Sequence, residues 1–87
     1  RSCPSAFECV VRNGAVVSIC NRDDFYHQPM VLQSGNSFGG HGKLVLKTGD
    51  CYRRRFVNPG REAIQVKIYD WSHSQERFVV TVLPARR

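Results

Sequence analysis

The stretch FECVVRNGAVVSIC, residues 7–20, decides the fold expected for this 87-residue chain. Asn13 and Gly14 separate two runs rich in β-branched residues, and Asn-Gly is the strongest short-range signal for a two-residue type I′ hairpin turn. We therefore predict a β-hairpin in which Val11 lies opposite Val16. The side chains on one face of this hairpin are expected to point into the core, namely Phe7, Cys9, Val11, Val16 and Cys20.

The rest of the chain shows further short strand patterns separated by turn residues. No window has a useful apolar period of 3.6 residues, so we expect little or no helix. The sequence predicts an all-β fold, a small six- to seven-stranded antiparallel β-sandwich, with residues 1–87 forming a single domain. The further strand patterns are PMVLQSG (29–35), KLVLKTGD (43–50), YRRRFV (52–57), AIQVKIYDW (63–71) and RFVVTVLP (77–84).

The cysteine pattern indicates an oxidising compartment. Four cysteines occur in this small chain, none in a C-x-x-C pair, and this pattern favours two disulfides over a zinc site. His27, His41 and His73 lie far apart, without metal-ligand spacing to a cysteine. We therefore expect a secreted protein with no metal and no cofactor. The chain starts with RSCPS and shows no signal peptide, so it is interpreted as a mature or trimmed form, and no apolar run is long enough to span a membrane.

The charge leaves the class of partner open. The formal net charge is +6 and the sequence pI is about 9.6. A basic surface of this kind can attract nucleic acid, an anionic membrane or an acidic protein partner, or it can serve only to keep a small domain soluble.

The segment CYRRRF, residues 51–56, concentrates this charge. Neither face of such a strand is cleanly apolar, so we place it at the edge or rim of a sheet, where arginine stems can lie along apolar surface. It is either a binding strip or an edge protected against aggregation. YDWSH, residues 69–73, is a second candidate contact, although a single Trp is more often core. The expected protein-binding surface consists of Lys43, Lys47, Tyr52, Arg53, Arg54, Arg55, Lys67 and Tyr69.

Catalytic motifs are weak. GGHGK, residues 39–43, lacks the first glycine, the following Ser or Thr and the helix of a phosphate-binding loop. A ribonuclease would need two titratable groups and a cation around one phosphate. The residues His41, His73, Glu76 and Arg54 could supply these, but no spacing brings them together. We expect no enzyme and no catalytic residues.

The cysteine positions resemble those of the MAX effectors, small ToxB-like secreted β-sandwich proteins of plant-pathogenic fungi. Cys9 lies in FECVVRNG, and Cys51 follows 42 positions later in LVLKTGDC. Four cysteines allow three connectivities, and the resemblance implies a Cys9–Cys51 bridge with Cys3–Cys20 as the second. Three strand patterns follow Cys51, whereas the family usually has two.

The resemblance implies a non-enzymatic virulence effector, possessing an exposed strand edge that binds a host protein such as an immune receptor with a heavy-metal-associated domain. Two alternatives stay open. One is a secreted inhibitor of a hydrolase that presents SGNSFGGHG (34–42) or DWSHSQ (70–75). The other is a basic RNA-binding or RNA-cleaving protein that uses Arg53, Arg54 and Arg55, with nucleic acid as the less favoured partner.

Overall fold

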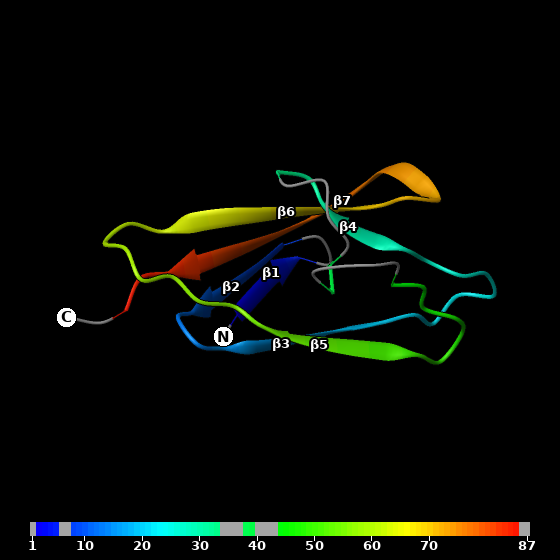
Figure 1. Ribbon diagram of the computed structural model, residues 1–87, viewed down its shortest axis with the longest axis horizontal. Coiled ribbons are helices and arrows are strands. Elements are labelled where there is room, and N and C mark those ends of the chain that lie inside the picture. Colours follow the sequence, from blue (N-terminus) through cyan, green and yellow to red (C-terminus); the bar gives the residue numbers. More distant parts are fainter. Residues whose placement is uncertain (1, 6–7, 34–37, 40–43, 86–87) are drawn as a thin grey trace.

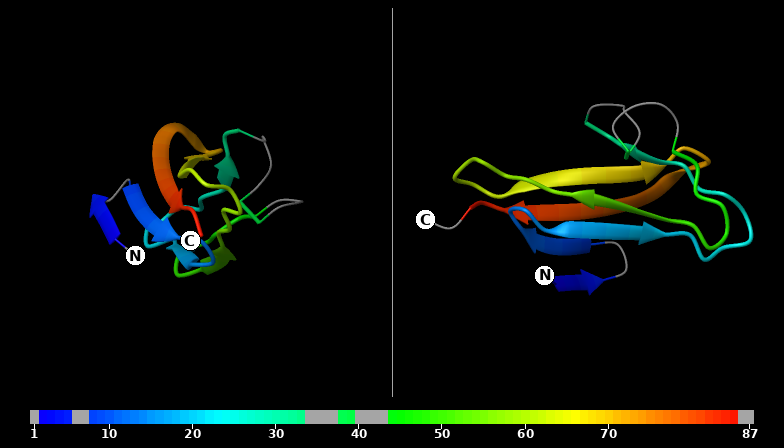
Figure 2. Two further views of the ribbon diagram at one scale, coloured as in Figure 1. Left: turned by 90° about the vertical axis from the view of Figure 1, so that its left-hand side faces the viewer. Right: turned by 60° about the horizontal axis from the view of Figure 1, so that its bottom comes forward.

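The computed structural model describes residues 2–5, 8–33, 38–39 and 44–85, which form a two-layer β-sandwich. A five-stranded sheet has the strand order β1-β2-β7-β6-β4, and a two-stranded sheet pairs β3 with β5. Figures 1 and 2 show the two-stranded sheet lying beneath the larger one. The strands of the described residues are β1 Ser2–Ser5, β2 Glu8–Arg12, β3 Val16–Cys20, β4 Pro29–Val31, β5 Cys51–Arg55, β6 Ile64–Asp70 and β7 His73–Leu83.

The predicted all-β sandwich is confirmed, with one change in strand direction. No helix occurs among the described residues, and none there is long and apolar enough to cross a membrane. The pair β2–β7 is parallel, with Glu8 opposite Val79 and Arg12 opposite Leu83, whereas the other described pairs are antiparallel. A parallel pair needs a long crossover, and here the chain passes through the second sheet between β2 and β7.

The predicted Asn-Gly hairpin is wrong, because β2 and β3 belong to different sheets. Gly14 has φ +90°, but no described non-glycine residue, Asn13 included, has a positive φ. A type I′ turn needs both. A turn with positive φ at the second central residue alone is typical of type II, which splays the flanking strands. The N–H of Asn13 donates to Leu83 O and that of Gly14 to Phe56 O, so the turn becomes a corner that joins both sheets.

This corner also changes the inward face of β3. Cys9 and Val11 on β2 are buried as predicted, but on β3 the buried residue is Val17, with Ile19 half-buried and Cys20 exposed. A strand that enters the opposite sheet must turn its other face to the core, and a shift of one residue exchanges the faces.

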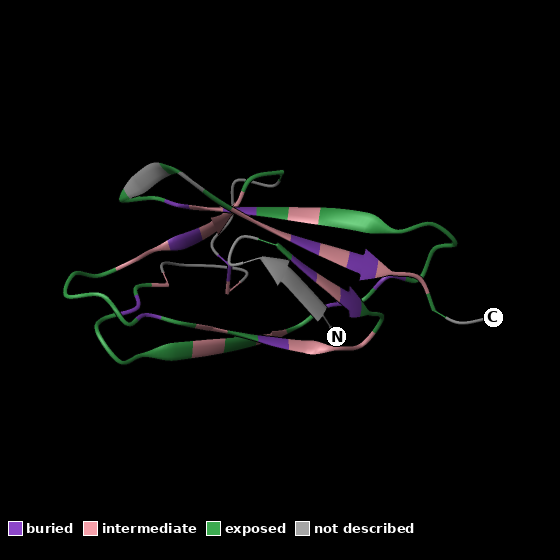
Figure 3. Cartoon of the chain, turned by 180° about the vertical axis from the view of Figure 1, so that it is seen from behind, coloured by how far each residue is buried: buried purple, intermediate pink, exposed green. Residues whose placement is uncertain are grey.

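The core lies between the sheets, as the purple positions of Figure 3 show. Val11, Val80 and Val82 form its centre and are at most 1% exposed. Phe38, from the glycine-rich stretch that was not expected in the core, is fully buried and lies 5.8 Å from Phe56 between ring centroids. Phe38 packs against Phe56 and Tyr52 and belongs to the core cluster.

The disulfide pairing differs from the predicted one. Cys20 is bonded to Cys51, its direct partner in the β3–β5 register, and their Cα atoms lie 4.0 Å apart. Cys9 is also disulfide-bonded. The implied Cys9–Cys51 and Cys3–Cys20 bridges are therefore wrong, because β5 pairs with β3 and not with β2.

Asn58 closes the end of the sandwich at which β3 and β6 begin, which we call the Asn58 end. Asn58 is 2% exposed, and its amide nitrogen donates to the carbonyl oxygens of Glu62 (2.8 Å) and Val82 (2.9 Å). Its side-chain oxygen accepts from the N–H of Gly60 (3.0 Å), and its own N–H donates to the Asn13 side chain (2.6 Å). One buried amide thus fixes a turn that has no regular structure of its own.

Candidate functional site

The residues of the predicted basic surface are divided between two faces of β5 and between the two sheets. On β5 the side chains of Tyr52 and Arg54 point inward, where they are half-buried. The guanidinium carbon of Arg54 lies 5.3 Å from the ring centroid of Phe38 and 5.1 Å from that of Phe56, and Arg54 donates to Phe38 O (3.2 Å). Tyr52 meets the Phe38 ring edge-on at 5.9 Å. Arg54 is therefore a cation–π bridge inside the sandwich.

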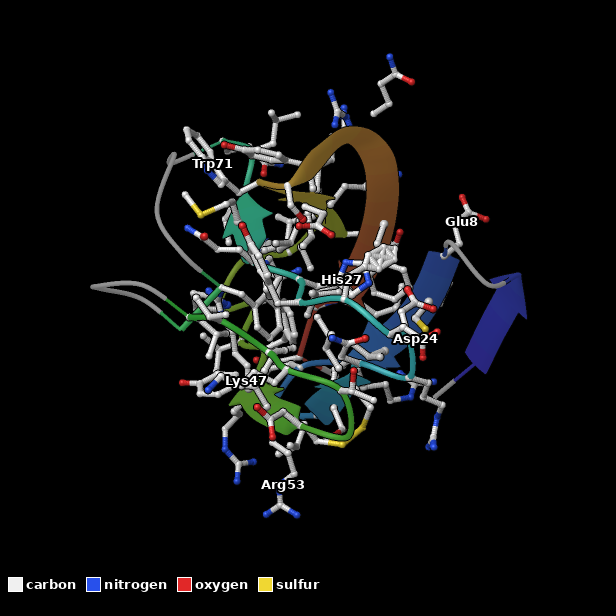
Figure 4. The ribbon with its side chains drawn as sticks, turned by 90° about the vertical axis from the view of Figure 1, so that its right-hand side faces the viewer. Glu8, Asp24, His27, Lys47, Arg53 and Trp71 are labelled. Atoms are coloured by element: carbon white, nitrogen blue, oxygen red, sulfur yellow. A yellow bond between two sulfur atoms is a disulfide. The ribbon has the colours of Figure 1, made fainter. Side chains whose placement is uncertain are left out.

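The other members of the predicted surface are scattered. Arg55 is exposed and donates to Gly14 O (2.6 Å). Arg53 extends away from the two-stranded sheet (Figure 4). Lys67 and Tyr69 belong to β6 in the other sheet, where Tyr69 lies 5.6 Å from the guanidinium of Arg77. Lys47 is exposed in the loop before β5, and Lys43 lies outside the described residues.

A different cluster forms at the opposite end of the sandwich from Asn58, which we call the His27 end. It is built by the loop between β3 and β4, the loop before β5 and the turn between β6 and β7. His27 exchanges two backbone hydrogen bonds with Leu46, of 2.9 and 2.8 Å, and the N–H of Trp71 donates to Gln28 O (2.9 Å). In Figure 4, which looks onto this end, His27 lies near the middle, between the two sheets.

Two carboxylates flank the imidazole of His27. Nδ1 contacts the Asp70 carboxylate, and Nε2 lies 2.6 Å from Oδ2 of Asp23. The His27 side chain is 17% exposed, that of Asp70 10% and that of Asp23 57%. One nitrogen therefore faces the interior and the other faces the surface.

Asp70 is held in place by several donors. Its Oδ1 accepts from the N–H groups of Gln28 and Ser72, both at 3.0 Å, and from the Ser72 hydroxyl at 2.8 Å, while Oδ2 faces His27. Burial by itself would raise the pKa of Asp70, but these hydrogen bonds together lower it to about 2. Asp70 is therefore an ionised, immobilised carboxylate.

His27 carries the opposite shift. Burial lowers the pKa of His27, but the hydrogen bonds and charges of Asp70 and Asp23 outweigh burial and hold the pKa above its ordinary value. Both ring nitrogens can donate only in the imidazolium form. The paired carboxylates favour a positive charge at this position.

Asn21 supports the loop that carries His27. It is 3% exposed, and its amide nitrogen donates to the carbonyl oxygens of Phe25 (2.8 Å) and Leu46 (2.7 Å). Its side-chain oxygen accepts from the N–H of Asp23 (2.8 Å), which fixes the residue that faces Nε2 of His27. A cavity of about 350 Å³ adjoins the cluster; its lining includes Ile19, Ile68 and Phe78 as well as His27 and Asp70.

The sequence analysis missed this cluster, because His27 and Asp70 are 43 positions apart. One signal could have indicated it: Asp70 continues the inward-facing series of Val66 and Ile68 on β6, and a carboxylate at the end of an apolar series needs a buried partner. His73 lies opposite Asp70 in the backbone register, although its side chain, like that of Glu76, lies outside the described part. His41 lies outside it altogether, and Arg54 is engaged in the core, so the proposed ribonuclease set is not assembled.

The donors form an incomplete metal-ligand set. No three His, Cys, Asp or Glu side chains among the described residues are arranged to hold one ion, since Asp23 and Asp70 lie on opposite nitrogens of His27. No described cysteine is free. The cluster can therefore offer one imidazole nitrogen and one carboxylate to a cation, without a thiolate.

Comparison with known proteins gives the fold a name. No protein-family model and no curated protein matches the sequence. Among solved structures, the purple cupredoxin from Nitrosopumilus maritimus aligns with a TM-score of 0.69 and 23% identity over 91% of this chain and 84% of that one. The chain has the cupredoxin fold. Structures of amicyanin align with a TM-score of 0.65 and 22% identity over 86% of this chain and 68% of theirs.

A third cupredoxin-fold neighbour is an enzyme. The Cu-containing nitrite reductase from Thermus scotoductus aligns with a TM-score of 0.66 and 20% identity over 91% of this chain but only 20% of its own. These neighbours contradict the predicted fungal effector function and the host protein or immune receptor as its partner. The MAX-effector resemblance itself is not tested by them and stays a prediction.

Proposed function

We propose that this protein is a non-enzymatic metal-binding protein, in which a divalent cation displaces the proton that Nδ1 of His27 shares with the Asp70 carboxylate and moves these two groups apart. The observation that carries the proposal is the placement of these two donors, which come from different segments and face each other at one end of the sandwich. Imidazole nitrogen and carboxylate oxygen are both ligands of zinc and of divalent copper. Water or a further side chain would complete the coordination.

The position of Asp23 supports the proposal. Histidines that bind a metal commonly donate their other ring N–H to a carboxylate, which orients the ring and raises its basicity. Nε2 of His27 has such a partner in Asp23 at 2.6 Å. The Asn21 side chain holds the backbone of Asp23, so the outer carboxylate is fixed as well.

The fold neighbours give independent support. Solved forms of amicyanin are described with Cu(I), and the nitrite reductase is described as Cu-containing. The disulfides suit an oxidising compartment, so we also propose that the protein works outside the cytosol.

Calorimetric titration of the disulfide-bonded chain with Zn²⁺ tests this function. We expect His27→Gln to weaken binding by more than the roughly 10- to 100-fold that loss of an outer partner costs, and Asp23→Asn to weaken it by about that factor. Asp24→Asn is the matched control, because Asp24 is an exposed neighbour of Asp23 in the same loop. The affinity of this variant for Zn²⁺ should stay within about twofold of that of wild type. Wild-type affinity in His27→Gln would contradict the proposal.

A measurement on the unmodified protein guards against misfolded variants. In NMR spectra of the imidazole nitrogens, Zn²⁺ should shift Nδ1 of His27 more than Nε2, since Nε2 keeps its hydrogen bond to Asp23. Unchanged His27 signals at saturating Zn²⁺ would place the ion elsewhere.

A further inference from the structure

The corner at Asn13 and Gly14 combines a reactive sequence with an exposed position at the Asn58 end. An asparagine that precedes glycine is especially prone to deamidation, because glycine has no Cβ to keep its backbone nitrogen away from the asparagine side chain. Among the described asparagines, only Asn13 precedes a glycine, and its side chain is exposed to water. Figure 1 shows this corner, between β2 and β3, at the end of the sandwich where β7 ends.

The reaction at such a pair passes through a cyclic imide. The backbone nitrogen of Gly14 attacks Cγ of Asn13 and forms an N–Cγ bond. The Cγ–Nδ2 bond breaks, and Nδ2 leaves as ammonia with the proton that the Gly14 nitrogen has lost. Water then opens the ring at one of its two carbonyls. Opening at Cγ gives aspartate, whereas opening at the backbone carbonyl gives isoaspartate, in which the main chain runs through the side-chain methylene.

The fold holds both reacting groups. The N–H of Gly14 donates to Phe56 O at 2.7 Å. This nitrogen must lose its proton before it attacks, and a hydrogen bond to the protonated form opposes that loss. The side-chain oxygen of Asn13 accepts from the N–H of Asn58 at 2.6 Å, so the group that must turn toward Gly14 is anchored. The N–H of Asn13 donates to Leu83 O at 3.1 Å, which ties the corner to β7 as well.

We infer that Asn13 is a deamidation site that the folded corner protects, and that it reacts when the corner opens locally and releases Gly14 from Phe56. The inference is independent of the proposed metal site, which lies at the other end of the sandwich. The two products differ in their fit. Aspartate keeps a side-chain oxygen that can accept from the N–H of Asn58, whereas isoaspartate lengthens the main chain by a methylene. Isoaspartate therefore prevents the corner from closing again.

The first test follows the disulfide-bonded wild type in mildly alkaline buffer, with and without unfolding concentrations of guanidinium chloride. Tandem mass spectrometry after reduction and tryptic digestion locates the product within residues 13–22, where Asn21 serves as an internal reference. We expect Asn13 to deamidate at least about 10-fold more slowly in the folded protein, because only the opened corner reacts. Equal rates in both conditions would overturn the protection, and absence of product at Asn13 in the unfolded chain would overturn the site.

Asn58→Ala and the matched control Asn21→Ala separate local opening from global unfolding. Each variant removes a buried amide that bonds two carbonyl oxygens, but only Asn58 adjoins the corner. We expect Asn58→Ala to accelerate deamidation of Asn13 by at least about 10-fold and Asn21→Ala by less than about threefold, with circular dichroism as the check of folding. Equal acceleration in both folded variants would overturn the local opening.

Hydrogen exchange in wild type decides the matter if either variant does not fold. The N–H of Gly14 must leave Phe56 O before it exchanges, so its exchange reports the same opening as the deamidation. We expect this N–H to be protected, with an opening free energy below that of global unfolding. An unprotected Gly14, or one that exchanges only through global unfolding, would overturn the inference.

Discussion

The two ends of the sandwich are built on the same device and differ in what is added to it. At each end a buried asparagine accepts from the N–H two residues ahead and donates to a carbonyl four residues ahead and to another from a distant segment. Asn21 does this at the His27 end and Asn58 at the Asn58 end. The His27 end adds an imidazole between two carboxylates, a cavity and the exposed ring of Trp71.

This difference between the two ends distinguishes residues that support the fold from residues that are candidates for function. A buried amide satisfies the backbone of a sharp loop, which explains both asparagines without any reference to function. Asp70 serves the same purpose, because its Oδ1 accepts from the backbone N–H groups of Gln28 and Ser72. The imidazole of His27 is different, because both of its ring nitrogens face carboxylates, and His27 is therefore the residue for which a function must be sought.

Removal of the Cys20–Cys51 bridge should have the largest effect on stability. The bridge closes a sequence separation of 31 residues, and its loss in the double variant Cys20→Ser/Cys51→Ser should lower the free energy of unfolding by roughly 4 kcal/mol. Since both cysteines lie at the His27 end, amide hydrogen exchange should accelerate more in residues 21–28 than in residues 57–63. Equal acceleration at both ends would contradict this assignment.

Loss of either asparagine should cost almost as much. Asn21→Ala removes a donor from Phe25 O and from Leu46 O, which keeps the N–H of His27, and Asn58→Ala removes one from Glu62 O and Val82 O. We expect each variant to lower the free energy of unfolding by about 3 kcal/mol in urea titrations. The ends should differ in a second measurement: Asn21→Ala weakens Zn²⁺ binding, because Asp23 and the His27 loop lose their support, and Asn58→Ala leaves it unchanged. If both variants bind Zn²⁺ alike, the two ends are not functionally distinct.

The metal-free protein should show a pH window in the contribution of the His27–Asp70 pair. The pKa of Asp70 falls from 3.8 to about 2 on folding, so its contribution of about 2 kcal/mol is present above pH 3.8 and is lost as the pH falls toward 2. The pKa of His27 is raised above 6.5, so its contribution is present below pH 6.5 and is lost as the pH rises through the raised value.

Stability of wild type and Asp70→Asn, measured by urea unfolding at a series of pH values, checks this window. The difference in unfolding free energy should be largest between pH 3.8 and 6.5 and should shrink on both sides. A difference that does not change with pH would show that Asp70 acts there through shape alone.

Substitutions of the β5 arginines should have the smallest effects on stability, and the effect should differ between the inward-facing and the exposed arginine. Arg54→Met removes the cation from between Phe38 and Phe56 and should lower the free energy of unfolding by about 1 kcal/mol. Arg53→Met, on the exposed face of the same strand, should change it by less than about 0.5 kcal/mol. If thermal denaturation shows a larger loss of stability for Arg53→Met than for Arg54→Met, the assignment of the inner and outer faces of β5 is wrong.

Alternation along single strands was enough to predict much of the fold. Val11 on β2 is buried as predicted, and Val80 and Val82, two residues apart on β7, are also buried, because side chains alternate between the two faces of a strand. The three strand patterns after Cys51, which departed from the MAX-effector resemblance, are all strands. The predicted basic surface is divided for the same reason that CYRRRF has no cleanly apolar face: Tyr52 and Arg54 face inward, whereas Arg53 and Arg55 are exposed.

The sequence by itself determined most of the strands, the inward side of most of them, and cysteines suited to disulfides. The strand predicted at 43–50 forms only an isolated bridge at Leu46 within its described part, and β1 was not predicted. Only the tertiary structure decided the partners: that β2 leaves β3 for β7, that Cys20 meets Cys51, and that His27 reaches Asp70. The physical reason is range. Strand periodicity is set by neighbouring residues, whereas pairing depends on which sheet covers which. Here the turn at Asn13 and Gly14, with a positive φ at Gly14 alone, forms a corner of the sandwich instead of a hairpin.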